Sequence, residues 1–308
     1  MSSFRVGVCI PVGPNRQGNL LRVLGDLERQ TYKPEVVVLV YDGFAPYEIG
    51  YQKLDVHTVE IPKHVPGNEQ PRNVGVRALE RFAPRVNYVW LLDTDIVFRP
   101  ECLAAYAEAY ELAPEPRIMI GPYDWLPKNG GGYPDLRNDQ RWDSFDEHGP
   151  EEVFQLGRDG RDLRGMVGFG LACFSGNLVW PIEEFRQVGG FHPEMHHGRC
   201  EDGELGLRAV SQGIAVSMVR KARGWHLWHQ VNEEWVLETN KVDVPIINRL
   251  HPWVENEGLV MTAKDGIRFD FRCEKCGARK NTGEYWIHYA SCKGEEDAGS
   301  PIDSSLGF

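Results

Sequence analysis

Two carboxylates one residue apart, Asp93 and Asp95, follow an apolar run that begins at residue 88. Such a run is typical of a strand buried on both faces, and the end of a buried strand is where an open α/β sheet places its ligands. In an extended Asp-x-Asp both side chains point the same way, so both can reach one hard divalent cation such as Mg2+ or Mn2+. Solvated turns and helix caps contain the same residues, so the pair alone does not distinguish a cation site from either of them.

Four further potential ligands gather near the C-terminus, as Cys273-x2-Cys276 followed by His288-x3-Cys292. This spacing fits one tetrahedral Zn2+, and so small a module would take most of its folding free energy from the metal. Free thiols are the alternative. Basic and aromatic side chains interleave across the same segment, a mixture that suits contact with nucleic acid and docking against the catalytic domain equally. Of the two, we favour docking.

The elements that position Asp93 and Asp95 alternate between strand and helix. Apolar runs predict strands at residues 5–12, 36–41, 54–61 and 88–92, and amphipathic spacing predicts helices at 19–30 and 70–82. This alternation predicts an α/β fold with a mostly parallel sheet flanked by helices. Further along, we expect helices at 100–112, 182–188 and 204–212, and strands at 117–121, 171–180 and 214–220.

The later part of the chain changes character twice. Residues 124–165 are rich in Gly, Asp, Arg and aromatic residues without periodicity, which is typical of a lid or binding loop. The regular pattern weakens at about residue 245. We therefore predict a catalytic domain at 1–244, a linker at 245–264, a zinc-binding module at 265–294 and a disordered tail at 295–308.

The composition is that of a globular protein with a substantial core, at 308 residues, 42% hydrophobic and 26% charged. A formal net charge of -11 argues against a chain built mainly to coat nucleic acid. No apolar stretch approaches the roughly 20 residues that span a bilayer, and residues 1–5 lead into a strand without a signal peptide's apolar region. We expect no membrane insertion and a cytoplasmic location.

Several short motifs follow one another in an order that is more specific than any one of them. Asp42-Gly43 ends the second predicted strand, residues 71–76 (PRNVGV) precede Asp93-x-Asp95, and Gly189-Gly190-Phe191 precedes Glu201-Asp202. Over residues 4–230 this order resembles the nucleotide-sugar glycosyltransferases of the GT-A fold, closest to the large inverting family 2. The resemblance implies a Rossmann-like fold and a nucleotide-sugar donor.

Residue by residue, the resemblance implies that Asp95 coordinates a Mn2+ or Mg2+ ion that bridges the donor diphosphate, while Asp93 contacts the ribose or reaches the metal through water. A cation there stabilises the charge on the departing nucleoside diphosphate. Asp42 would hold the base or ribose, although a simple turn is the alternative. Arg72 would support the nucleotide or its phosphates, or form an ordinary helix-start salt bridge. The implied donor contacts are Pro11, Asp42, Arg72, Asn73, Asp93, Thr94 and Asp95.

The resemblance also implies that Asp202 is the base that takes the acceptor's proton in inverting transfer, with Glu201 orienting the acceptor. Acids at a helix N-terminus are also good caps, so a purely structural capping role for Glu201 and Asp202 is the alternative. His226 or His229 would complete the metal shell; we favour His226, with a buried structural histidine as the alternative. Ser175-Gly176-Asn177 and Trp180 lie where relatives contact the donor sugar or the acceptor. His192 is a candidate for lining the acceptor site, with a polar loop as the alternative.

These observations predict a metal-dependent glycosyltransferase that moves a hexosyl or N-acetylhexosaminyl group from a nucleotide donor, with UDP favoured, to an acceptor hydroxyl with inversion. The acceptor stays open between a saccharide, a protein and a modified nucleic acid. The alternatives are a retaining transferase, a DNA-modifying transferase that uses the zinc module, and a non-catalytic sugar- or nucleic-acid-binding protein. A nucleotidyltransferase would need a stronger phosphate loop than Gly13-Pro14-Asn15-Arg16.

Overall fold

The computed structural model describes residues 3–50, 53–121, 123–125, 173, 175–196, 200–219, 221–227, 233–253, 271–272 and 279–280. The chain forms two compact units, Met1–Val231 and Asn232–Phe308. Most of the predicted loop at 124–165, the four predicted zinc ligands and the predicted tail at 295–308 lie outside the described residues.

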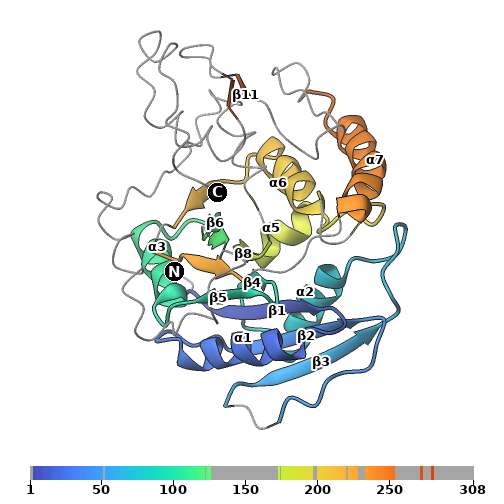
Figure 1. The fold of residues 1–308 in the computed structure, drawn as a ribbon. Helices are drawn as coiled ribbons and strands as arrows, with labels where there is room; N and C mark the ends of the chain where they lie inside the picture. The colour runs from blue at the N-terminus through green and yellow to red at the C-terminus, as the bar shows by residue number, and fades with distance from the viewer. Residues whose placement is uncertain are drawn as a thin grey trace, which may run out of the picture. The chain divides into compact units, whose positions relative to one another are not determined.

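A seven-stranded sheet is the frame of the first unit (Figure 1). Its strands are β1 (Val6–Val12), β2 (Val36–Asp42), β3 (Val56–Ile61), β4 (Tyr88–Leu92), β6 (Ile118–Ile120), β8 (Asn177–Pro181) and β9 (Val216–Met218), in the order β3-β2-β1-β4-β8-β6-β9. Strands β1 to β4 run parallel, and so do β6 and β9. The mostly parallel sheet predicted from the sequence is confirmed. Strand β8 runs antiparallel to β4 and β6, a reversal that was not predicted.

A small three-stranded sheet lies at the end of β4. It contains β5 (Ile96–Phe98), β10 (Gly224–His226) and β7 (Tyr123–Trp125), with β10 in the centre. Strand β10 pairs antiparallel with β5 and parallel with β7. The sequence did not predict this sheet, because strands of three residues are too short to show a period.

The helices of the first unit lie close to their predicted positions. Among the described residues they are α1 (Gln17–Arg29), α2 (Pro71–Phe82), α3 (Cys102–Leu112), α5 (Ile182–Gln187) and α6 (Glu201–Ser211). Proline at the first position of α2 is well suited to a helix start, because its missing N–H would have no partner there. Helix α6 carries Glu201, Asp202 and Glu204 in its first turn, where carboxylates are favoured by the helix dipole.

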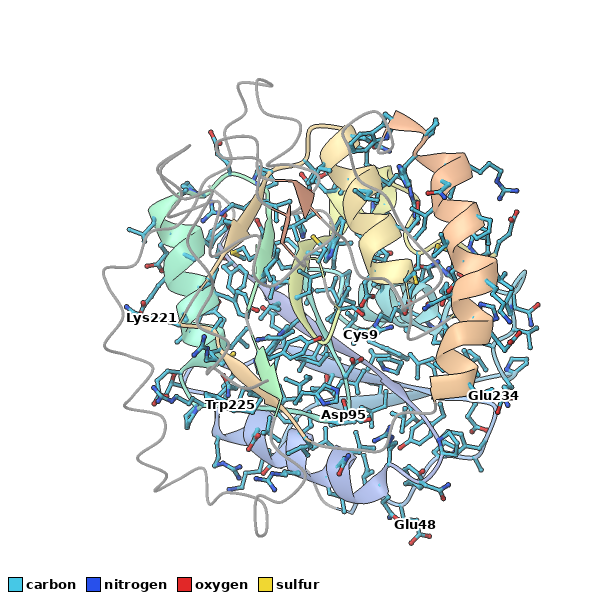
Figure 2. The ribbon with its side chains drawn as sticks, turned by 45° about the horizontal axis from the view of Figure 1, so that its top comes forward. Cys9, Glu48, Asp95, Lys221, Trp225 and Glu234 are labelled. Carbon is cyan, nitrogen blue, oxygen red and sulfur yellow. The ribbon has the colours of Figure 1, made fainter. Side chains whose placement is uncertain are left out.

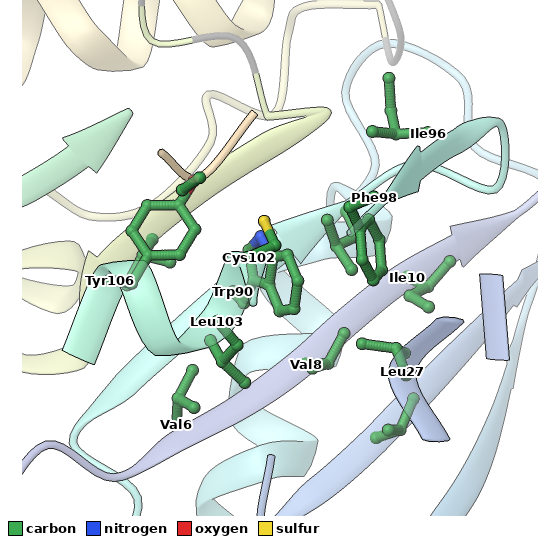
Figure 3. Close-up of a cluster of buried hydrophobic side chains, with 14 of the residues drawn as sticks. Val6, Val8, Ile10, Leu27, Trp90, Ile96, Phe98, Cys102, Leu103 and Tyr106 are labelled. Carbon is green, nitrogen blue, oxygen red and sulfur yellow. The ribbon is translucent and has the colours of Figure 1, made fainter. Parts of the chain in front are cut away.

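Strand β1 divides its side chains between two helical layers. Val6, Val8, Ile10 and Val12 belong to a core cluster that also contains residues of α1 and α3, and Figure 3 shows Leu27, Leu103 and Tyr106 within it. On the other face, a Cβ added to Gly7 would lie 2.7 Å from Leu79 of α2. Helices α1 and α3 therefore cover one face of β1, and α2 covers the other.

The second unit contains α7 (Glu233–Leu250) and the short antiparallel pair β11 (Phe271–Arg272) and β12 (Arg279–Lys280). Helix α7 continues through Pro245, so the predicted linker that starts at residue 245 begins inside a helix. Within the described part of the chain, no helix is both long and apolar enough to cross a membrane.

Helix α2 approaches β1 so closely that only glycine fits at residue 75. A Cβ added there would lie 2.2 Å from the Cys9 sulfur and 3.1 Å from Val40. We expect Gly75→Ala to lower the free energy of unfolding by about 1–3 kcal/mol, as overpacked core substitutions do. Urea denaturation monitored by tryptophan fluorescence measures this change.

Gly18 near the start of α1 is the matched control, because an added Cβ there meets nothing within 4 Å. Gly18→Ala should leave stability unchanged or slightly raised. In a Cys9→Ala background the clash is relieved, so Gly75→Ala should cost less than in the native background. Equal losses in the two backgrounds would show that the sulfur contact is not the cause.

Candidate active site

Asp93 and Asp95 lie where the chain passes from β4 in the large sheet to β5 in the small one. The Asp95 carbonyl oxygen accepts a hydrogen bond of 2.7 Å from the N–H of Leu227, which directly follows β10. Figure 2 labels Asp95 and, on β10, Trp225. The small sheet thus fixes the second carboxylate against the strand that carries His226.

The His226 ring faces the Asp95 carboxylate. Its Nε2 lies 3.5 Å from Asp95 Oδ1, and its Nδ1 lies 2.9 Å from the Leu227 carbonyl oxygen. A carbonyl oxygen only accepts, so Nδ1 carries the proton and a neutral ring directs the Nε2 lone pair at the carboxylate. Two acceptors in this arrangement repel each other unless the ring is protonated or a cation lies between them.

The distance between these two atoms suits a shared metal ion. Two ligand atoms that are each about 2.1 Å from one ion lie about 3 Å apart at a right angle and about 4.2 Å apart when opposite, and the 3.5 Å between His226 Nε2 and Asp95 Oδ1 falls between these limits. Within the described ranges, no group of three or more His, Cys, Asp or Glu side chains is arranged to hold a metal. Mg2+ commonly takes only one or two protein ligands and completes its shell with phosphate oxygens and water. Asp95 and His226 therefore fit an ion that arrives with a phosphate ligand.

A positively charged group reaches Asp95 from the residue before α1. Arg16 Nη1 lies 3.3 Å from Asp95 Oδ2. This contact was not predicted, because the two residues are far apart in the sequence and an arginine before a helix has no distinctive pattern.

Arg72, in the first turn of α2, joins the two acidic regions. Its side chain is only 3% exposed; Nη2 donates to Asp93 Oδ1 at 2.5 Å and Nη1 to Glu201 Oε1 at 3.4 Å. Burial lowers the pKa of Arg72, but the negative charges of Asp93, Asp202 and Glu201 outweigh it and the pKa is raised. The guanidinium is therefore a permanent positive charge between the two acid pairs.

Asp202 lies in the first turn of α6 and is held by Ser175, which was expected in a stretch near the donor sugar or the acceptor but not in this role. The Ser175 Oγ donates to Asp202 Oδ1 at 2.6 Å, and the Ser175 N–H donates to Oδ2 at 3.1 Å. Burial raises the pKa of Asp202, Arg72 and the two serine hydrogen bonds lower it, and Asp93 raises it; the net direction is upward. A carboxylate with a raised pKa is a stronger base, so it is better suited to accept a proton.

Tyr123 of β7 faces the same acids and was not selected from the sequence. Burial, and then the charges of Asp93, Asp202 and Asp95, raise the pKa of its hydroxyl. Its ring centroid lies 6.0 Å from that of His226. The phenol therefore stays neutral and can act only as a neutral hydrogen-bonding group.

Glu201 has a different place from the one predicted for an acceptor contact. Its side chain has no exposed surface and pairs with Arg72. A carboxylate so placed braces the buried guanidinium, which argues against the predicted role of orienting an acceptor.

The remaining predicted donor residues are spread along the same edge of the sheet. Asp42 ends β2 half-buried, and its Oδ1 accepts the His64 N–H at 2.5 Å. Pro11 is buried in β1, and Thr94 is buried between the two acids. The contacts of Asp42, Pro11 and Thr94 with a donor stay predictions.

Asn73 makes a reciprocal pair with the backbone of Phe191. Its Nδ2 donates to the Phe191 carbonyl at 2.8 Å, and its Oδ1 accepts the Phe191 N–H at 2.8 Å. The neighbouring Gly190 has a left-handed φ of 66°, and a Cβ there would lie 2.5 Å from Asn73 Oδ1. Asn73 thus ties α2 to the Gly-Gly turn, and a donor contact from its side chain stays a prediction.

The predicted acceptor role of Asn177 conflicts with its burial. The side chain has no exposed surface, and its Oδ1 accepts from Trp90 Nε1 at 2.9 Å and Tyr106 Oη at 3.0 Å. Its Nδ2 donates to the Ala222 carbonyl at 2.7 Å. An amide with these partners holds the core together and has no surface to offer an acceptor.

Trp180 is likewise wholly buried on β8, with its ring 5.7 Å from that of Phe185, so it too belongs to the core. His192 is partly exposed, and its Nδ1 accepts the Glu194 N–H at 3.3 Å. An acceptor contact from His192 stays a prediction. His229 lies outside the described residues.

No protein-family model matches the chain. Validoxylamine A glucosyltransferase of Streptomyces hygroscopicus subsp. limoneus is 26% identical over 264 residues, which is 77% of this chain and 55% of that protein. The crystal structure of S. aureus TarS superposes with a TM-score of 0.51 at 17% identity, over 79% of this chain and 40% of TarS. TarS 1-349 in complex with UDP-GlcNAc gives a TM-score of 0.50 at 16% identity, over 79% and 67% of the respective chains.

The chain has a glycosyltransferase-like fold. It spans about half the length of the curated relative that it matches. The named similarities come from chains that share only 16–26% of their residues with this one.

The environment of Asp202 predicts how its carboxyl titrates. Because burial raises its pKa, the group should titrate above the ordinary aspartate value of about 3.9. Ser175→Ala removes a hydrogen bond that the charged form accepts, so it should raise the pKa further. Carboxyl 13C NMR titration, assigned with Asp202→Asn, measures both values.

Ser211→Ala is the control on the same helix, because the Ser211 Oγ donates only to the Arg208 carbonyl on the exposed side. It should leave the Asp202 titration unchanged. An Asp202 pKa at or below the ordinary value, or one that falls in Ser175→Ala, would contradict this account.

Proposed function

We propose that the chain is a metal-dependent glycosyltransferase that moves a sugar from a nucleotide donor, with UDP favoured, to an acceptor hydroxyl with inversion. The observation that carries the proposal is the placement of the acids: Asp95 faces His226, and Asp93 shares the buried guanidinium of Arg72 with Glu201, the neighbour of Asp202. The fold and the UDP-sugar bound by TarS support it. The acceptor stays open between a saccharide, a protein and a modified nucleic acid.

The donor side of the proposal uses the ends of β1, β2 and β4. Asp95 and His226 would hold Mn2+ or Mg2+, which supplies positive charge to the diphosphate as it departs. Asp93 keeps 35% of its side chain exposed while Arg72 fixes one of its oxygens. This exposure leaves the other oxygen for the ribose or a metal-bound water, and Asp42 would contact the base or ribose.

The acceptor side uses Asp202. The acceptor oxygen attacks the anomeric carbon from the face opposite the diphosphate, its proton passes to an Asp202 carboxylate oxygen, and the bond to the diphosphate breaks with its electron pair. Ser175 fixes the orientation of that carboxylate through two hydrogen bonds. Arg72 lies between this acid and Asp93, so it keeps the departing charge and the base from repelling each other.

Two substitutions should separate metal binding from proton transfer. Asp95→Asn should abolish Mn2+-dependent binding of UDP, because the remaining amide is a weak metal ligand. Asp202→Asn should retain that binding while UDP release from a nucleotide sugar falls by about 10²- to 10⁴-fold, the usual contribution of a general base. Calorimetry with UDP and MnCl2 and a UDP-release assay over a panel of donors measure the two effects.

Asp55→Asn is a charge-matched control, since Asp55 is exposed, lies just before β3 and pairs with His57 within that strand. It should change neither quantity. Full activity in Asp202→Asn would remove the base assignment, and NMR of the product's anomeric configuration would reveal a retaining enzyme. A wild-type chain that binds sugars or nucleic acid, yet releases no UDP with Mn2+, would favour the non-catalytic alternative.

We further propose that Cys273, Cys276, His288 and Cys292 bind one Zn2+. The spacing of the four residues supports this, as does the antiparallel pairing of β11 with β12, whose sequences flank both cysteines of the first pair. The interleaved basic and aromatic residues of this segment suit docking against the rest of the chain as well as contact with nucleic acid, and we favour docking.

Metal analysis tests the zinc proposal directly. We expect about one zinc per chain by plasma mass spectrometry, and loss of that zinc in Cys273→Ser. Cys102→Ser is the control, because Cys102 is a free thiol buried in the first unit, and burial raises its pKa and so disfavours the thiolate that zinc would bind. Zinc retained in Cys273→Ser would contradict the ligand set. Salt-sensitive DNA binding that disappears with the zinc would favour the DNA-modifying alternative.

A further inference from the structure

Arg16 is a charged contact of Asp95 that the proposed mechanism does not use. One oxygen of the carboxylate lies 3.5 Å from His226 Nε2, and the other lies 3.3 Å from Arg16 Nη1. The Arg16 side chain is 32% exposed whereas that of Asp95 is 9% exposed. The guanidinium therefore reaches solvent while it neutralises a carboxylate that is nearly buried.

The turn that carries Arg16 is held in place from outside the helix. Tyr47 Oη accepts the Arg16 N–H at 3.1 Å and donates to the Gly13 carbonyl at 3.2 Å. Asn15 adopts a left-handed φ of 61°, a conformation that asparagine tolerates better than most residues. These contacts fix Arg16 between the end of β1 and the start of α1, at the same sheet edge as Asp42 and Asp95.

We propose that Arg16 is the counter-cation of Asp95 in the donor-free protein, and that the divalent cation of a nucleoside diphosphate displaces it. The released guanidinium then binds oxygens of the same diphosphate. This inference rests on the proposed function, because it assumes that a diphosphate and its cation bind at Asp95.

The physical reason is a competition between positive charges. A guanidinium and a divalent cation on one carboxylate lie within a few ångströms of each other and repel strongly at low dielectric. The diphosphate resolves this conflict, since its oxygens offer a second anionic partner with the geometry that arginine favours. Asp95 would thus be charge-neutralised in both states, first by Arg16 and then by the metal.

The inference predicts opposite effects of one substitution on two ligands. Arg16→Met removes the competitor, so Mn2+ alone should bind about two- to fivefold more tightly, the range of a partly exposed ion pair. With Mn2+ saturating, UDP should bind about tenfold or more weakly, because a charge-assisted hydrogen bond is lost. Electron paramagnetic resonance of free Mn2+ gives the first quantity, and calorimetry with UDP gives the second.

Arg5→Met is the matched control. Arg5 precedes β1 at its other end and pairs with Glu35 at 2.6 Å, so the substitution removes the same charge away from Asp95. It should alter neither affinity. Arg16→Gln keeps a polar side chain and tests the same two arms should the methionine variant fail to fold.

The outcomes separate this inference from the proposed function. Unchanged or weaker Mn2+ binding in Arg16→Met, or unchanged UDP binding, would overturn the role of Arg16 while wild-type UDP binding still supported the transferase. A wild-type chain that binds Mn2+ but no nucleoside diphosphate would overturn the proposed function. The Mn2+ arm would then still show whether Arg16 competes for Asp95.

Discussion

The guanidinium of Arg72 is the charge on which the arrangement of the site depends. It is almost wholly buried and contacts carboxylates from two distant parts of the chain, Asp93 after β4 and Glu201 at the start of α6. A buried charge that loses a partner costs several kcal/mol, so α2, the end of β4 and α6 are bound to one another through this side chain. Because Asp202 follows Glu201, the position of the proposed base is set by the same ion pair.

Packing around α2 determines where that guanidinium lies. Gly75 lets the helix approach Cys9 of β1, and Asn73 pairs with the backbone at Phe191 beside the left-handed Gly190. Both residues lie within a turn of Arg72 on the same helix. A shift of α2 would therefore move Arg72 away from both carboxylates at once.

Much of the framework could be predicted from the sequence, because strands β1, β2 and β4 and helices α1 and α2 each bury a local apolar pattern. The reversed β8 and the three-residue strands carry no period that distinguishes their direction or pairing. Burial of polar residues also escaped prediction: Asn177 and Glu201 look like site residues in the sequence, yet each has core partners far along the chain. Arg16 and Ser175 show the converse, since their roles arise only from contacts made in three dimensions.

The charges at this edge of the sheet also explain why a divalent cation suits the site. Asp93, Asp95, Glu201 and Asp202 bring four formal negative charges when ionised, against two positive charges on Arg16 and Arg72. A nucleoside diphosphate adds further negative charge and would be repelled by this surplus. Arg72 is paired with Asp93 and the buried Glu201, so most of its charge is already offset and it does not remove this surplus. A cation held between Asp95 and His226, as proposed, would remove both the repulsion between those two side chains and the repulsion of the diphosphate.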